Sequence, residues 1–148
     1  MKKVLVLMVI VALALIFVFL KSDGITGNVA LEIQESSSVG SQLPGSLVLT
    51  IEQGDSIEKS TPILISLTKG KKEVIEVKTL SMAEFIALSD SPITPVTKDS
   101  KEYFETPGSY SVKTSLLIGY TFTEKGNYEL FFRIFDPDIT IRKEISVK

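Results

Sequence analysis

The chain has 148 residues, carries a formal net charge of −2 and contains no Cys, no His and no Trp. Without Cys it has no disulfide, no thiolate nucleophile and no lipid-modified cysteine anchor. Without His it has no Ser-His-Asp triad and no His-rich metal site. The charge gives no reason to expect a nucleic-acid partner, and the length suits one ordinary domain.

The amino terminus carries an unbroken run of 17 apolar residues, Val4–Leu20, which follows Lys2 and Lys3. A helix of that length spans roughly 25 Å, the short end of what crosses a bilayer. Basic residues ahead of such a helix predict a cytoplasmic amino terminus and an outward remainder. We therefore expect residues 1–21 to be a membrane anchor, with residues 4–20 in the lipid bilayer and the rest of the chain outside the cytoplasm.

A cleaved signal peptide is the alternative for the same segment. Its apolar region is usually about 7 to 15 residues long and ends at small residues. Here the run is longer and ends in aromatic and branched residues, and only Ser22 and Gly24 offer a small-residue pair behind it. The pattern favours a retained signal anchor.

Residues 22–45 are polar, rich in Gly and Ser and poor in aromatic residues, which predicts a linker. Within it, Val29, Leu31 and Ile33 alternate with polar residues, so this part also fits a short strand. Outside residues 1–21 the chain holds 13 basic and 18 acidic residues, a net charge of −5. An acidic outer part stays soluble and does not seek anionic lipid.

Residues 46–148 show apolar residues with a period of two, in short runs separated by turn residues, which predicts an all-β antiparallel sandwich. We expect six strands, over Leu47–Ile51, Ile63–Leu67, Val74–Leu80, Leu116–Phe122, Tyr128–Ile134 and Ile139–Val147.

One short helix interrupts the strand pattern. Ser81 and Glu84 have the spacing of a capping box, and Leu80 and Phe85 stand at the positions of a hydrophobic staple. This predicts a helix of one or two turns that ends at about Leu88. Capping explains the Ser and the Glu without a catalytic role.

The segment Ser89–Gly108 is long for a loop, and it carries Tyr103 and Phe104. Loops of this length are often functional, so the aromatic pair is a candidate partner-binding tip. The alternative is a crossover whose aromatic residues pack inward and anchor it, and an aromatic pair in a polar loop favours this second interpretation.

In the predicted strand Tyr128–Ile134, the face opposite the core would show Phe131 and Arg133, followed by Phe135. Two phenylalanines on an outer face are candidates for a docking patch. The alternative is a central strand that is covered on both sides, which the imperfect alternation of many strands favours.

No pattern indicates catalysis, a cofactor or a metal. Asp136-Pro137-Asp138 supplies too few oxygens for calcium and has the composition of a turn. The other carboxylates show no spacing that singles out an acid–base pair. We expect no enzyme activity.

The stretch from Tyr120 to Leu130 contains an aromatic strand, a turn glycine and then Asn127-Tyr128-Glu129-Leu130. It resembles the end of many immunoglobulin-like extracellular domains, although the Cys and Trp of antibody domains are absent. The resemblance implies a single immunoglobulin-like β-sandwich.

The front half, with its basic start, its apolar run and Ile25-Thr26-Gly27-Asn28-Val29, resembles uncharacterised archaeal membrane-anchored surface proteins. We expect a non-enzymatic, single-pass cell-surface or envelope protein that presents its domain to a protein partner or gives structural support. The alternatives are a stator-like accessory subunit of an archaeal surface filament or envelope assembly, and a secreted binding protein if the amino terminus is cleaved.

Overall fold

The computed structural model describes residues 28–135 and 138–148. The predicted anchor, residues 1–21, and the beginning of the predicted linker lie outside the described residues. Among those that are described, no helix is both long enough and apolar enough to cross a membrane.

The described chain consists mainly of strands, which confirms the all-β prediction. The strands are β1 (Asn28–Glu32), β2 (Ser36–Ser37), β3 (Ser46–Ile51), β4 (Ile57–Glu58), β5 (Pro62–Lys69), β6 (Glu73–Ser81), β7 (Val96–Lys98), β8 (Lys101–Phe104), β9 (Gly108–Lys113), β10 (Gly126–Phe135) and β11 (Asp138–Val147), and the helices are α2 (Met82–Leu88) and α3 (Thr114–Leu117).

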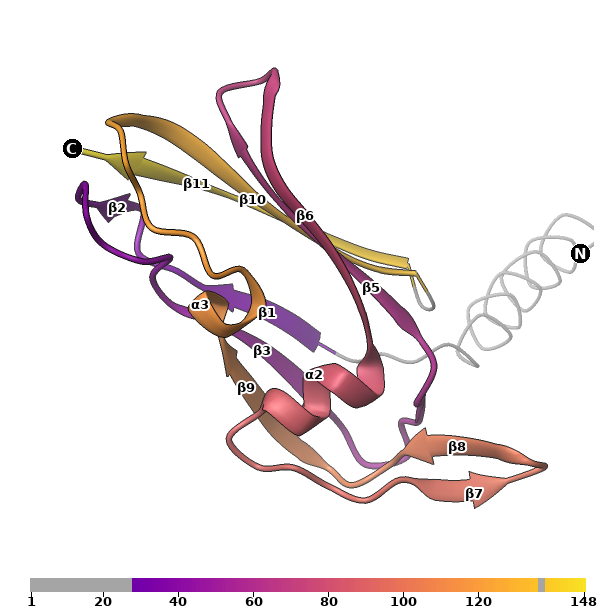
Figure 1. Cartoon of the computed structure of the whole chain (residues 1–148). Coiled ribbons are helices and arrows are strands. Elements are labelled where there is room, and N and C mark those ends of the chain that lie inside the picture. The colour runs from indigo at the N-terminus through magenta and orange to yellow at the C-terminus, as the bar shows by residue number, and fades with distance from the viewer. Residues whose placement is uncertain (1–27, 136–137) are drawn as a thin grey trace, which may run out of the picture.

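Two larger sheets form two layers (Figure 1). One has the strand order β1-β3-β9 and the other the order β2-β11-β10-β5-β6. A small sheet, β4-β8-β7, lies at one end of the molecule. Every pairing is antiparallel except that of β2 with β11, which is parallel.

The core lies between the two larger sheets and follows the period-two pattern. In β10 the even-numbered residues from Tyr128 to Ile134 are buried, while the odd-numbered ones are half-buried or exposed. Strands β3 and β5 bury alternate residues in the same way. Because successive side chains of a strand point to opposite faces, this alternation gives each sheet one apolar inner face.

The described part of the predicted linker belongs to the folded domain, which corrects the boundary at residue 46. The alternation of Val29, Leu31 and Ile33 does mark a strand, β1, which pairs with β3. Leu31 and Leu43 are in the core. Gly45 has a φ of 84°, and a Cβ there would lie 2.2 Å from the Glu32 carbonyl oxygen, so this tight passage requires glycine.

The strand predicted over Leu116–Phe122 is wrong. Helix α3 begins at Thr114 and takes up the start of this segment instead. At its first residue the Thr114 hydroxyl donates to the Pro44 carbonyl at 2.7 Å and the Thr114 amide donates to the Gly45 carbonyl at 3.1 Å. Leu116, which the strand pattern places inside, is 53% exposed. On the side of β3 away from β1, the pairing strand is β9, which begins at Gly108, where the predicted loop ends.

The predicted helix is confirmed as α2. The Glu84 amide donates to the Ser81 hydroxyl at 3.3 Å, and the Ser81 amide donates to the Glu84 carboxylate at 2.7 Å. This is the reciprocal pattern of a capping box. Phe85 is 1% exposed and joins the helix to the core.

The start of β10 is fixed by a hydrogen bond across the preceding turn. The Tyr128 hydroxyl donates to the Glu124 carbonyl at 2.9 Å. The Tyr128 ring lies 4.8 Å from that of Phe122, edge to face, and burial raises the pKa of its phenol. The phenol therefore remains a neutral donor well into the alkaline range.

We expect Tyr128→Phe to lower the free energy of unfolding by about 0.5–1.5 kcal/mol, because the part-buried hydrogen bond from its hydroxyl to the Glu124 carbonyl is lost. Urea denaturation of the full chain measures this. The control is Tyr103→Phe, since the half-buried Tyr103 hydroxyl has no hydrogen-bond partner among the described residues and should change stability by less than about 0.5 kcal/mol. Equal losses in the two variants would contradict the role of this hydrogen bond.

A second contact ties the same turn to β5. Lys69 and Glu124 form a hydrogen-bonded ion pair, which raises the pKa of the lysine and lowers that of Glu124 below its usual value of 4.5. A carboxyl whose pKa is lower in the folded state contributes stability above its unfolded pKa and loses that contribution as the pH falls through the folded pKa.

We therefore expect Glu124→Gln to reduce stability at pH 7 and to have a progressively smaller effect as the pH falls through the folded pKa of Glu124, because the wild-type carboxyl then becomes protonated as well. The effect should be small and should weaken with added salt, because the Glu124 side chain is 69% exposed. Denaturation over a series of pH values from 7 downward measures it. Glu52→Gln, at an exposed side chain outside any ion pair of the described residues, should show no such pH dependence.

Candidate functional site

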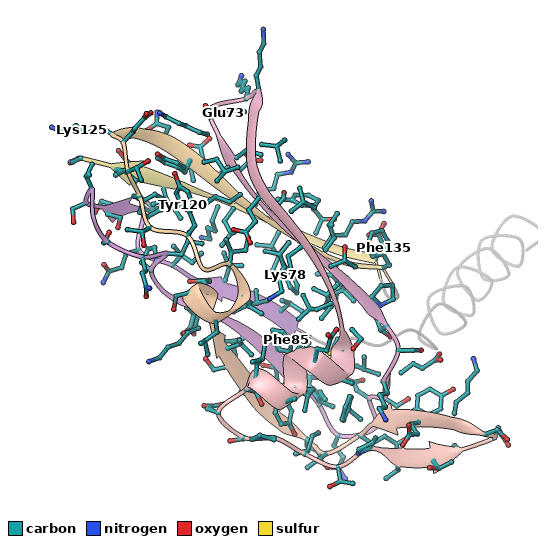
Figure 2. The ribbon with its side chains drawn as sticks, in the orientation of Figure 1. Glu73, Lys78, Phe85, Tyr120, Lys125 and Phe135 are labelled. Carbon is teal, nitrogen blue, oxygen red and sulfur yellow. The ribbon has the colours of Figure 1, made fainter. Side chains whose placement is uncertain are left out.

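The outer face of β10 carries the main cluster of candidate binding residues. Phe131 and Arg133 are half-buried, and Phe135 is 43% exposed. Phe135 is the last residue of β10, and Lys125 lies at the other end of the strand (Figure 2). The pairing of β10 with β11 places Arg142 beside Phe131. We call Phe131, Arg133, Phe135 and Arg142 the aromatic–arginine patch.

Arg133 joins the aromatic ring of Phe135 to a carboxylate. Its guanidinium carbon lies 4.7 Å from the centre of the Phe135 ring. Its Nε donates to one carboxylate oxygen of Asp138 at 2.9 Å, and its Nη2 donates to the other at 3.2 Å. Two parallel bonds of this kind fix the plane of a guanidinium, so the cation is held over the ring.

Arg142 repeats this arrangement one step along the sheet. Its guanidinium carbon lies 4.9 Å from the centre of the Phe131 ring, and its Nη1 donates to Glu129 at 3.3 Å. The Arg142 side chain is 64% exposed. The patch therefore combines partly exposed aromatic rings with oriented cations, a composition that is enriched in protein interfaces.

An open hollow borders the patch. It is lined by Phe131, Arg142 and Glu129 together with residues of β5 and of the turn that follows, Ser66, Thr68, Gly70 and Lys71. The floor of this hollow is a sheet face, so it can receive the side chains of a partner and does not enclose a small ligand.

The aromatic pair of the predicted loop lies elsewhere. Tyr103 and Phe104 are on β8 in the small sheet, and the segment forms a β7–β8 hairpin whose turn residues Asp99 and Ser100 have positive φ angles. Phe104 is 3% exposed and belongs to the core, while Tyr103 is half-buried. Phe104 therefore anchors the segment, as in the inward-packing alternative, and does not present a binding tip.

The candidate residues thus form two groups. The structure brings Phe131, Arg133 and Phe135 onto one face, and Tyr103 and Phe104 lie on another sheet. The sequence analysis missed Arg142, although a hairpin that pairs Phe135 with Asp138 fixes the position of Arg142 beside Phe131. The signal was the alternation of Ile139 and Ile141, which puts Arg142 on the outer face.

Carboxylates of the described residues do not gather into a metal site. No group of three or more His, Cys, Asp or Glu residues in the described ranges is arranged to hold a metal ion. Asp138 binds Arg133, and Asp136 and Pro137 lie outside the described residues.

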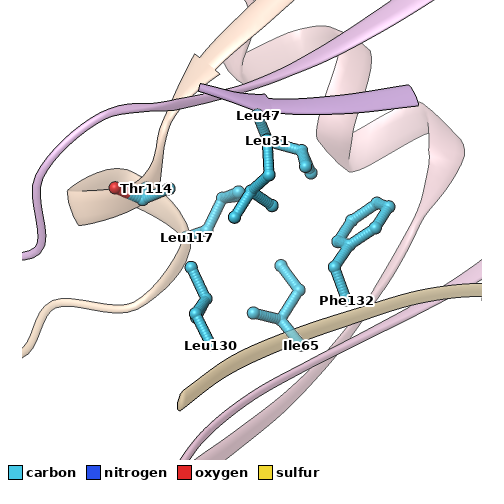
Figure 3. A pocket seen from close by; sticks show the side chains of 7 residues that line it. All are labelled: Leu31, Leu47, Ile65, Thr114, Leu117, Leu130 and Phe132. Carbon is cyan, nitrogen blue, oxygen red and sulfur yellow. The ribbon is translucent and has the colours of Figure 1, made fainter. Parts of the chain in front are cut away.

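One small void lies inside the core, between the two larger sheets and α3 (Figure 3). Its volume is about 10 Å³, and six apolar side chains and Thr114 line it. This is about the space that one water molecule needs, so the void holds no organic ligand.

Comparisons with known proteins identify no relative. No family model matches the chain, and no curated protein matches it. Solved structures of superoxide reductase (neelaredoxin) from Ignicoccus hospitalis align with TM-scores of 0.38, 0.37 and 0.35 at 10%, 11% and 11% identity. The first alignment covers 86% of this chain and 85% of the other, and the next covers 83% and 82%. Similarity this weak carries no argument about fold or function.

The contact between Arg133 and Phe135 can be measured by a double-mutant cycle. We expect Arg133→Ala and Phe135→Ala to show a coupling free energy of about 0.5–1 kcal/mol in urea denaturation, because the cation lies over the ring. The control cycle, Arg142→Ala with Phe135→Ala, should be additive within about 0.5 kcal/mol, since Arg142 contacts Phe131 instead. Additivity in both cycles would show that the Arg133–Phe135 contact contributes nothing.

Proposed function

We propose that this chain is a non-enzymatic, single-pass membrane protein of the cell surface or envelope, which presents an immunoglobulin-like domain to a protein partner. The observation that carries the proposal is the apolar run at residues 4–20, which stands close ahead of a β-domain whose first described strand begins at Asn28. The domain would then be outside the cytoplasm, with its amino terminus directed to the membrane.

The strand order supports the immunoglobulin-like assignment. The orders β1-β3-β9 and β11-β10-β5-β6 correspond to strands A-B-E and G-F-C-C′ of that fold. The Tyr128–Glu124 hydrogen bond at the start of β10 has the geometry of the tyrosine corner, which stands at the start of strand F. Both features arise without the Cys and Trp of antibody domains.

The start of the domain at Asn28 shortens the proposed tether. Only residues 21–27 separate the apolar run from β1, and fully extended they would span about 25 Å. In the proposed topology the domain is therefore held close to the bilayer and does not stand on a long stalk.

The aromatic–arginine patch is the proposed partner surface. It offers Phe135, partly exposed, together with Arg133, whose guanidinium is oriented by two hydrogen bonds to Asp138, and Arg142, which makes one hydrogen bond to Glu129. Side chains held in their bound geometry lose less conformational entropy on association. The absence of Cys and His from the sequence removes the usual nucleophile and base, which supports a binding role over an enzymatic one.

Cysteine labelling in intact cells tests the proposed topology and the proposed surface together. The chain has no native Cys, so Phe135→Cys and Lys125→Cys each introduce a single exposed thiol. We expect a membrane-impermeant maleimide to label both from outside. We also expect Phe135→Cys to be labelled several-fold more slowly in the native envelope than in the purified chain, with no such difference for Lys125→Cys.

Failure to label either variant in intact cells, together with labelling after lysis, would place the domain in the cytoplasm and refute the topology. Equal protection ratios for the two thiols would instead refute the patch as an occupied surface. As a control for insertion, Leu13→Arg with Ile16→Arg should abolish outside labelling, because each charge costs about 2.5–3.5 kcal/mol at the centre of a membrane helix.

A further inference from the structure

In the described part of the chain, β6 is the longest of the strands that stand last in a sheet. The strand has nine residues, stands last in the five-stranded sheet and pairs only with β5. Figure 1 shows it at the side of the sheet away from β11. No backbone hydrogen bond from another described element satisfies its second edge. Such an edge is a template for pairing with another strand.

In β6, Val77 lies between two residues of opposite charge. Glu76 precedes it and Lys78 follows it. Their register partners on β5 are Leu67 and Ile65, which are buried, so both charged side chains lie on the inner side of the sheet. Both are half-buried, and no ion pair of the described residues includes either one.

Val77 itself lies on the outer side, where it is 56% exposed. Its partner on β5 is Ser66, which in turn pairs with Phe131 of the patch. Figure 2 shows Lys78 part-way along β6 and Glu73 at the end of the strand farthest from α2. The charged pair thus occupies the middle of the open edge and not its frayed end.

We propose that two copies of this chain associate through antiparallel pairing of β6 with β6, with the two-fold axis at Val77. In this register Glu76 of each copy stands opposite Lys78 of the other, and the two Val77 side chains stand opposite each other. Directly opposed residues of an antiparallel pair have Cβ atoms about 4.5–5.5 Å apart, close enough for both ion pairs and for the valine contact. The two five-stranded sheets become one continuous sheet.

An inward-pointing lysine and a bulge are also devices that protect an edge from unwanted pairing, and β6 has both, with its bulge at Ile75, opposite Leu67 and Thr68 of β5. A foreign strand added here would bury the charges of Lys78 and Glu76 without partners, which is costly. A second copy in the proposed register supplies the opposite charge to each of them. The same residues therefore reject other strands and select the strand's own copy.

The two-fold symmetry of the proposed dimer allows both chains to be anchored in one membrane. This inference rests on the proposed function. A two-fold axis between antiparallel strands of one sheet is perpendicular to the sheet, so the inner faces of both copies lie on the same side. Strand β1, where the described chain begins, is on that side in each copy. Two anchors can then enter one bilayer, and tethering raises the effective concentration for pairing.

Disulfide formation by single cysteines tests the register. In the full chain in detergent, Val77→Cys places two thiols opposite each other on the axis, at a separation that suits a disulfide. Mild oxidation should convert most of this variant into a covalent dimer. Val74→Cys, at a side chain that is 61% exposed, lies three residues from the axis and beyond the bulge, so its two thiols are far apart and it should form at least tenfold less dimer. Equal yields from the two variants would overturn the proposal.

Charge reversal in the Val77→Cys background tests the selection. Glu76→Lys opposes two lysines, and Lys78→Glu opposes two glutamates, so each should lower the dimer yield several-fold. The double variant restores opposite charges in the same register and should recover most of the yield. A double variant as poor as the single ones would overturn the proposed pairs. The measurement in detergent does not depend on the direction of membrane insertion, so it can fail while the proposed topology holds, or the reverse.

Discussion

The alternation of side chains along β10 is the constraint on which the rest of the molecule depends. Strand β10 pairs with β11 on one side and with β5 on the other, and its residues from Tyr128 to Ile134 alternate between the core and the outer face. A shift of one residue in this strand would move Phe132 to the solvent and Phe131 into the core. The register of β10 therefore determines both which of its residues join the core and which join the aromatic–arginine patch.

That register is also fixed by polar contacts at the start of the strand. The Tyr128 hydroxyl binds the Glu124 carbonyl, the Gly70 amide donates to the Asn127 carbonyl at 2.8 Å, and Lys69 pairs with Glu124. The first contact joins β10 to the turn before it, the second joins β10 to the β5–β6 turn, and the third joins the turn before β10 to β5. The hydrophobic pattern fixes which face is buried, and these polar contacts fix where the strand begins.

The long regular strands could be predicted from the sequence because their burial is one-sided, so that apolar residues recur every second position in β3, β5 and β10. Helix α2 could be predicted because its capping box is a local signal.

Other features could not be predicted from a local pattern. Residues Leu116–Phe122 also show apolar residues at alternate positions, but the structure of this segment depends on the contacts of Thr114 with Pro44 and Gly45. These contacts join segments far apart in the chain, so no local pattern contains them. Strand β2, two serines paired with β11, has no apolar signal at all. In the same way, Phe131, Arg133 and Phe135 could be found from one strand, whereas Arg142 required the pairing of two.

The other strand edges show why β6 stands apart. Strand β9 also ends a sheet, but the Asp90 amide donates to the Ser111 carbonyl at 3.1 Å and the Asp90 carboxylate accepts from the Ser111 amide at 3.1 Å, so its edge is partly satisfied by the chain itself. Strand β2 is only two residues long, too short to guide a partner strand, and it leaves most of β11 with an open edge as well. What distinguishes β6 is a glutamate and a lysine two positions apart on its inner side, next to its open edge. Charged residues that serve only solubility would be expected on the exposed side of the sheet, where water solvates them fully. On the inner side Glu76 and Lys78 lose part of their solvation, which costs free energy. A second copy in the proposed register offsets that cost by supplying an opposite charge to each.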